Sequence, residues 1–204
     1  DLLKKADVGF AMGSGTEVAK EAGDITILDD NFSSIEKAIL YGRTMFKSIR
    51  KFLIFQLTVN VAAVLTCFLA PFFGENTILT VIQLLVVNLA MDTLAAIAFG
   101  SEPALKEYMR DKPVPRDESI VTKNMLIQVI ISALYITALC LGIRFLPALK
   151  GLIGASAADA VYLNSAVFAT FMMSITFNGF NARTSHLNPF EHLGRNRNFL
   201  LVKI

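Results

Sequence analysis

The chain has 204 residues, of which 54% are hydrophobic and 18% are charged, and its mean hydropathy is +0.55. This composition excludes an ordinary soluble domain and favours an integral membrane protein. The net charge is only +2, and the charged residues gather between apolar runs, so the sequence gives no support for nucleic-acid binding.

The first 32 residues have the pattern of a small α/β fold. Residues 8–12 and 25–28 are short apolar runs typical of buried strands, and residues 17–22 between them favour a helix. Ser14 and Glu17 have the spacing of a helix-capping box. The glycines of this segment lack the G-x-G-x-x-G spacing of a dinucleotide-binding loop, so we interpret them as turn residues.

A helical pattern then begins at Ser33 and continues through residue 51, which predicts a stalk leading into the membrane. Beyond it lie four apolar stretches, each of about 20 residues and therefore long enough to cross a hydrocarbon core about 30 Å thick. The predicted spans are residues 52–73, 78–99, 125–146 and 161–180. We thus expect a mainly α-helical membrane protein with four transmembrane helices and a small N-terminal α/β piece. The short connector 74–77 makes the first two spans an antiparallel hairpin.

Basic residues predict which connectors face the cytosol. They cluster before the first span, in residues 100–124, and in residues 181–204 after the fourth span, whereas the opposite connectors contain few. The positive-inside rule then places these segments and the α/β piece in the cytosol. The apolar end of the chain from Asn198 predicts the start of a further helix. The lipid bilayer is therefore the expected environment, and the pattern fits the plasma membrane and an organelle membrane equally.

Polar side chains inside the first two spans predict a cation site. Asn88 and Asp92 are four residues apart, so in an α-helix both project from one face. An aspartate at mid-span costs about 3 kcal/mol on insertion scales, and such a residue usually marks an ion or proton path. Asn60 can face them across the hairpin. The three side chains would supply part of the six to eight oxygens that Ca²⁺ prefers. The alternative interpretation is that they only hydrogen-bond the helices together.

Several segments resemble P-type cation-transporting ATPases of the calcium-pump kind. Residues 4–13 are similar to the end of the phosphorylation domain, and residues 56–61 and 87–95 resemble membrane helices 5 and 6 of plasma-membrane-type calcium pumps. Glu102 with Pro103, and residues 177–183, extend the resemblance. The resemblance implies a C-terminal-half fragment, in which residues 1–32 are the end of the phosphorylation domain and residues 33–51 are the stalk. The membrane helices 5 to 8 would correspond to residues 52–73, 78–99, 125–146 and 161–180. The loop between helices 6 and 7 would be residues 100–124.

The resemblance implies an ATP-driven pump that forms an aspartyl-phosphate intermediate and exports Ca²⁺ from the cytosol. Asn60, Asn88 and Asp92 would be its calcium ligands. Two-site pumps have further oxygen ligands at the positions of Ala63, Met91 and Ile175, so the resemblance implies one Ca²⁺ per cycle. It places no catalytic or cofactor-binding residue in this chain, because ATP and Mg²⁺ would bind to the remaining domains of the same pump.

Two alternatives stay open at this point. The first alternative is a pump of the same family that transports Mn²⁺, Na⁺ or H⁺, because one carboxylate and two amides do not identify the ion. The second is a non-catalytic membrane module, such as a channel-like fragment. The sequence contains no basic amphipathic tail that would indicate a calmodulin site, and it does not identify a regulatory subunit.

Overall fold

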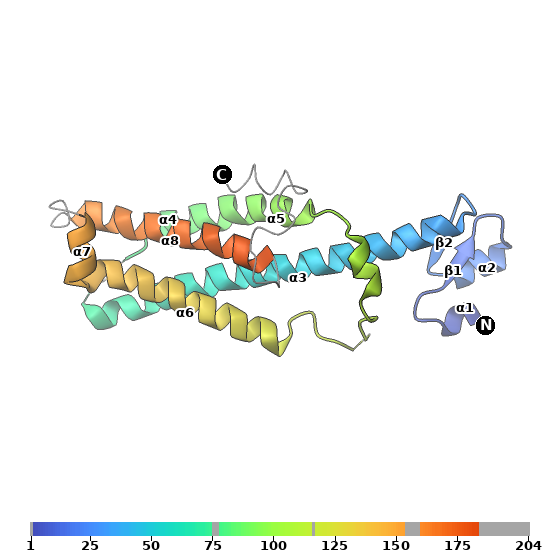
Figure 1. Cartoon of the computed structure of the whole chain (residues 1–204), viewed down its shortest axis with the longest axis horizontal. Helices are drawn as coiled ribbons and strands as arrows, with labels where there is room; N and C mark the ends of the chain where they lie inside the picture. Colours follow the sequence, from blue (N-terminus) through green and yellow to red (C-terminus); the bar gives the residue numbers. More distant parts are fainter. Residues whose placement is uncertain (1, 75–77, 116, 154–159, 184–204) are drawn as a thin grey trace. The chain divides into compact units, whose positions relative to one another are not determined.

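The computed structural model describes residues 2–74, 78–115, 117–153 and 160–183, and the chain forms two compact units. The first unit contains residues 1–46 and 104–113, and the second contains residues 47–103 and 114–204. Figure 1 shows the order of the helices and strands along the chain. The predicted start of a further helix at Asn198 lies outside the described residues.

The first unit contains the predicted strand–helix–strand arrangement. After a short helix, α1 (Leu2–Lys5), strand β1 (Phe10–Met12) pairs in parallel with β2 (Ile25–Ile27), and helix α2 (Glu17–Ala22) makes the crossover between them. Parallel strands need such a crossover connection. The hydroxyl of Thr16, not that of Ser14, caps α2 by accepting a hydrogen bond from the Ala19 amide at 3.3 Å.

Two aspartates close the turn between β2 and the long helix α3 (Phe32–Leu69). Asp29 accepts a 2.6 Å hydrogen bond from the Ser34 hydroxyl, and Asp30, whose φ is 51°, accepts one from the Ser14 amide at 3.0 Å. Because these bonds favour the charged carboxylates, they hold the pKa of both groups below the ordinary value. The turn thereby fixes the start of α3 against the glycine-rich loop after β1.

The 3₁₀ turn η3 (Lys106–Arg110) belongs to the same unit as the start of α3. The Arg43 guanidinium of α3 donates hydrogen bonds of 2.8 Å to the backbone carbonyls of Tyr108 and Asp111. Tyr108 is buried. A single arginine thus holds this part of the predicted 6–7 loop along the helix.

The second unit is a helical bundle. Helix α3 ends in the 3₁₀ turn η1 (Ala70–Phe73), and the remaining elements follow in chain order. They are α4 (Val81–Val86), the π-helical turn η2 (Val87–Met91), α5 (Asp92–Gly100), α6 (Lys123–Phe145), α7 (Pro147–Ile153) and α8 (Ala160–Arg183). Helices α6 and α8 lie side by side. The predicted span over residues 78–99 contains the π turn, and the helical segment Val81–Gly100 continues through it.

The core of the bundle is built from apolar residues at helical spacing. Phe55 and Val59 of α3 are completely buried, as is Phe171 of α8, and Ile175 follows one turn later on the same face of α8. Cys140 of α6 lies in the same core, as expected for a thiol that serves in packing. The core therefore joins α3, α6 and α8.

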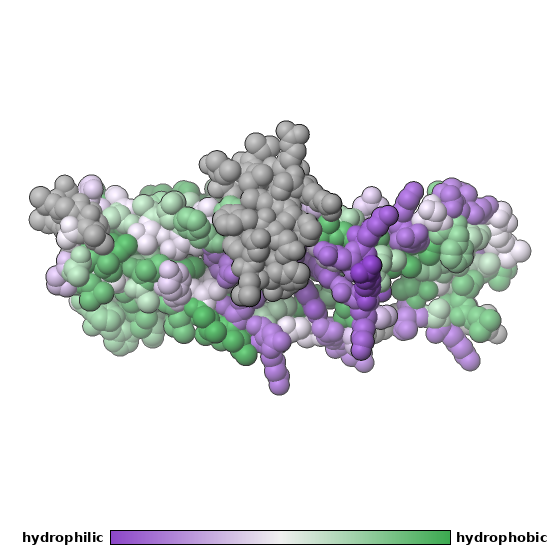
Figure 2. Space-filling model, in the orientation of Figure 1, coloured by the Kyte–Doolittle hydropathy of each residue, from purple (hydrophilic) through white to green (hydrophobic). Residues whose placement is uncertain are grey.

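The outer surface of the bundle is also apolar. Large side chains such as Val81, Leu89 and Ile131 remain more than half exposed, and Figure 2 shows hydrophobic residues over much of the visible surface of the helices. Among the described residues, three helical segments are long and apolar enough to cross a membrane: Phe32–Phe73, Val81–Gly100 and Lys123–Phe145. Helix α8 covers the predicted fourth span, whose membrane crossing stays a prediction. Such a surface is suited to contact with lipid.

Candidate cation site

Asp92 is the first residue of α5 and follows the π turn directly. Its side chain is partly buried, and its Oδ2 atom accepts a hydrogen bond of 2.5 Å from Nε2 of Gln56 on α3. This bond joins the first two spans across the hairpin. Apart from Asp92, residues 52–73 and 78–100 contain no Asp, Glu, Lys, Arg or His, so the carboxylate is the one such charge within these two segments.

Two oxygen atoms of this pair have no hydrogen-bond partner within the described part of the chain. They are Oδ1 of Asp92 and Oε1 of Gln56, and both are buried. A buried carboxylate or amide oxygen without a partner is energetically unfavourable, because no hydrogen bond replaces the lost contact with water. Both atoms are hard oxygen acceptors, which a cation such as Ca²⁺ can satisfy. The chemistry of the donor set therefore fits a cation.

The two predicted asparagines lie on either side of this pair. Asn60 is partly buried and follows Gln56 by one helical turn, so both amides belong to the same face of α3. Asn88 lies within the π turn and is exposed. Among the described residues, no hydrogen bond joins either asparagine to Asp92. The structure thus places Gln56, rather than Asn60 or Asn88, against the carboxylate.

The π turn explains why Asn88 and Asp92 do not share one environment. Its hydrogen bonds connect residues five apart, so the turn is wider than an α-helical turn and shifts the angle between residues on either side. Asp92 consequently approaches α3 while Asn88 remains exposed. Single π turns within α-helices frequently occur at functional sites. The four-residue spacing of Asn88 and Asp92 predicted an ordinary α-helix here, and therefore one common face.

Comparison with known proteins gives a match over most of the chain. Residues 76–204 match the family model described as "Cation transporting ATPase, C-terminus". The chain belongs to this family. It is 44% identical to calcium-transporting ATPase 12, plasma membrane-type, of Arabidopsis thaliana over 97% of this chain and 19% of the relative. It is 42% identical to plasma membrane calcium-transporting ATPase mca-1 of Caenorhabditis elegans (98% of this chain, 17% of the relative) and 41% identical to human plasma membrane calcium-transporting ATPase 1 (98% and 17%). The chain therefore spans about a fifth of the length of these ATPases.

A second polar feature of this chain is an ionic cluster centred on Glu102, just beyond the end of α5. One carboxylate oxygen pairs with the Lys51 ammonium, and the other lies 3.4 Å from Nε of Arg183 at the end of α8. The side chains of Glu102 and Arg183 are only 6% and 5% exposed. Glu102 therefore ties together α3, the segment after α5, and α8. Sequence reasoning missed this cluster, because its partners come from three distant segments.

Replacing Glu102 by leucine is expected to destabilise the bundle by about 3–5 kcal/mol, because it leaves two largely buried cations without their carboxylate. The thermal unfolding midpoint of the solubilised protein measures this loss. Glu118→Leu is a matched control: Glu118 pairs with Arg50 at 2.7 Å but is 35% exposed, and an exposed pair contributes about 0–1 kcal/mol. Equal shifts in the two variants would contradict the role of the Glu102 cluster.

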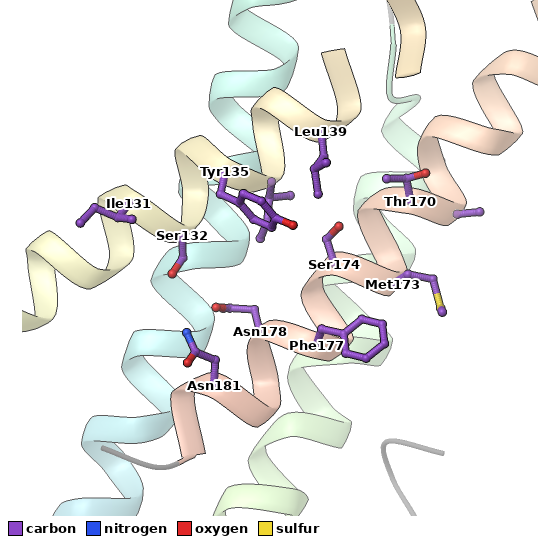
Figure 3. Close-up of a pocket in the computed structure, with 12 residues that line it drawn as sticks. Ile131, Ser132, Tyr135, Leu139, Thr170, Met173, Ser174, Phe177, Asn178 and Asn181 are labelled. Atoms are coloured by element: carbon purple, nitrogen blue, oxygen red, sulfur yellow. The ribbon is translucent and has the colours of Figure 1, made fainter. Parts of the chain in front are cut away.

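A groove of about 720 Å³ lies between α6 and α8. Figure 3 shows Ser132 and Tyr135 of α6 facing Ser174 and Asn178 of α8 across it. Its lining residues include no carboxylate, in contrast to the Gln56–Asp92 pair. Within the described residues, no group of three or more His, Cys, Asp or Glu side chains could hold a metal. The single carboxylate of Asp92 between two spans is therefore the strongest candidate for the cation site.

Proposed function

We propose that this chain is the ion-pathway part of a P-type ATPase that exports Ca²⁺ from the cytosol. The observation that carries the proposal is the unpaired, buried Oδ1 atom of Asp92, within a membrane span and beside a second unpaired oxygen. A carboxylate in this position favours a cation over plain helix packing, since packing alone would require no charge. The relatives compared above are calcium-transporting ATPases, which favours Ca²⁺ among the possible ions.

In this proposal Asp92 provides the charge of the site, and Asn60 and Asn88 contribute amide oxygens. The remaining ligands would be backbone carbonyls, water or side chains outside this chain. We further propose one Ca²⁺ per cycle. Ile175 is fully buried among apolar residues and has no side-chain oxygen, and the side chains of Ala63 and Met91 likewise lack one. A second calcium site of carboxylate and hydroxyl ligands at these three positions is therefore disfavoured.

The proposal also includes the arrangement in the membrane. Helix α8 is the fourth span, residues 1–32 are the end of a cytosolic phosphorylation domain, and residues 33–51 are the stalk. ATP, Mg²⁺ and the phosphorylated aspartate would belong to the remaining domains of the same multi-pass pump. Within this chain, the stalk would transmit their motions to the spans that hold Asn60 and Asp92.

The ion dependence of phosphorylation tests this function. In the full-length pump that contains this segment, we expect ATP to form an acid-stable phosphoenzyme when Ca²⁺ is present, and we expect sealed vesicles to accumulate Ca²⁺. Parallel assays with Mn²⁺, Na⁺ and a pH gradient identify the transported ion. If one of these ions, and not Ca²⁺, supported phosphorylation, the ion would have to be reassigned. Calcium flux that needed no ATP would instead indicate a channel.

A further inference from the structure

Gln56 is the one residue of α3 that contacts Asp92 by a hydrogen bond in the structure. The direction of this bond is determined by chemistry. An ionised carboxylate only accepts hydrogen bonds, so the amide must turn its NH₂ group toward Oδ2 of Asp92. The carbonyl oxygen of Gln56 then points away from that bond, and it is buried without a hydrogen-bond partner among the described residues. One end of the amide is therefore satisfied, while the other end is not.

We infer that Gln56 is part of the cation site, with its amide nitrogen orienting the Asp92 carboxylate and its amide oxygen serving as a ligand of the transported cation. This inference rests on the proposed function of Asp92. It adds a side chain that the spacing of polar residues did not single out as a ligand. It also assigns a distinct task to each end of one amide group.

The geometry of the pair permits this assignment. Within an amide or a carboxylate the two polar atoms are about 2.2 Å apart, as follows from standard bond lengths. With Nε2 and Oδ2 2.5 Å apart, the unpaired oxygens of Gln56 and Asp92 are separated by at most about 7 Å. Two oxygens bound to one Ca²⁺ at about 2.4 Å lie no more than about 5 Å apart, so small side-chain rotations bring both onto one ion.

Simple helix packing explains the pair less well. A glutamine that only joins two helices would place both ends of its amide in hydrogen bonds, since each unmet polar atom is costly away from water. Here the unmet atoms are two acceptors, one on each partner, which is the arrangement that a cation satisfies. Asn60, one turn further along the same face of α3, provides a third oxygen on this side.

The inference is tested by Gln56→Leu in the full-length pump, with Ca²⁺ as the probe and phosphorylation from ATP as the readout. We expect the calcium concentration for half-maximal phosphorylation to rise about tenfold or more, because a ligand and the hydrogen bond that orients Asp92 are both lost. The maximal level at saturating calcium should be retained. Gln128→Leu, the same change at a partly buried glutamine of α6, is the matched control and should leave the calcium dependence unchanged.

Gln56→Glu provides a second test that does not depend on whether the leucine variant folds. The variant places a second carboxylate beside Asp92, and residues 125–143 and 161–182 of the neighbouring helices contain no other charged side chain. Two such carboxylates share a proton, which calcium must displace. We expect the logarithm of the apparent calcium affinity to depend on pH more steeply than in the wild type, by about one proton per ion.

Two results would overturn the inference: an unchanged calcium dependence in Gln56→Leu, or an unchanged pH slope in a folded Gln56→Glu variant. The parallel variant Asp92→Asn separates this failure from failure of the proposed function. If Asp92→Asn removes calcium-dependent phosphorylation while both Gln56 variants behave as wild type, the calcium site stands and Gln56 is excluded from it. If Asp92→Asn is itself silent, the proposed function fails as well.

Discussion

Asp92→Asn is expected to raise the calcium concentration needed for phosphorylation by about a hundredfold or more, and to abolish calcium uptake at physiological calcium. The substitution keeps the shape of the side chain but removes the one carboxylate of residues 52–73 and 78–100. A site made only of neutral oxygens attracts a divalent cation far less strongly, because the ion loses the charge that offsets its dehydration. Calcium titrations of phosphoenzyme formation and of uptake into sealed vesicles measure both effects.

The control for this variant is Glu118→Gln, which makes the same carboxylate-to-amide change outside the predicted spans. Its ion pair with Arg50 is partly exposed, so calcium affinity should remain that of the wild type. Normal calcium transport by Asp92→Asn would show that the carboxylate only packs the helices. Both the ion and the site would then have to be reassigned.

Met45→Pro is expected to abolish transport while leaving phosphorylation by ATP intact. Met45 lies within α3, which is continuous from Phe32 to Leu69, and its side chain is 65% exposed. The main effect of the substitution is therefore on the backbone. Proline removes one helical hydrogen bond and collides with the preceding turn, which costs about 3 kcal/mol or more and kinks the helix. A kinked stalk should transmit motion poorly to the membrane spans.

The matching control is Met45→Ala, which shortens the same exposed side chain but preserves the helix. It should transport calcium at the wild-type rate. The two measurements are the level of phosphoenzyme and the calcium uptake per phosphoenzyme turnover. If Met45→Pro transported calcium with wild-type coupling, α3 would not be the element that transmits the motion.

The features predicted well from the sequence are those encoded locally. The apolar runs predicted where α3, α6 and α8 lie, and the two short apolar runs predicted the strands of the first unit. The capping residue of α2 differed from the prediction, because Ser14 and Thr16 can both cap a helix and only the backbone of the folded loop decides between them. Boundaries of this kind depend on one or two residues of context.

The features that sequence reasoning missed depend on contacts between distant segments. Residues 87–91 contain no glycine or proline, so nothing in their composition indicated a π turn. The ion pairs of Glu102 join three segments that only the folded bundle brings together. The contact of Gln56 with Asp92 is different, because a signal was present: Gln56 precedes Asn60 by four residues and therefore shares its helix face.

The π turn has a mechanical consequence for the second span. The π turn contains one more residue than an α-helical turn, and this one-residue bulge can shift along the span while the helix stays intact. When such a bulge moves by one residue, the side chain that it passes turns about the helix axis by about 100° and advances by about 1.5 Å. With Glu102 anchoring the far end, a shift of the bulge past Asp92 would reorient this carboxylate while the ends of the span stay in place. The polar side chains of such a span can take two orientations about the helix axis without a rigid-body movement of the whole helix.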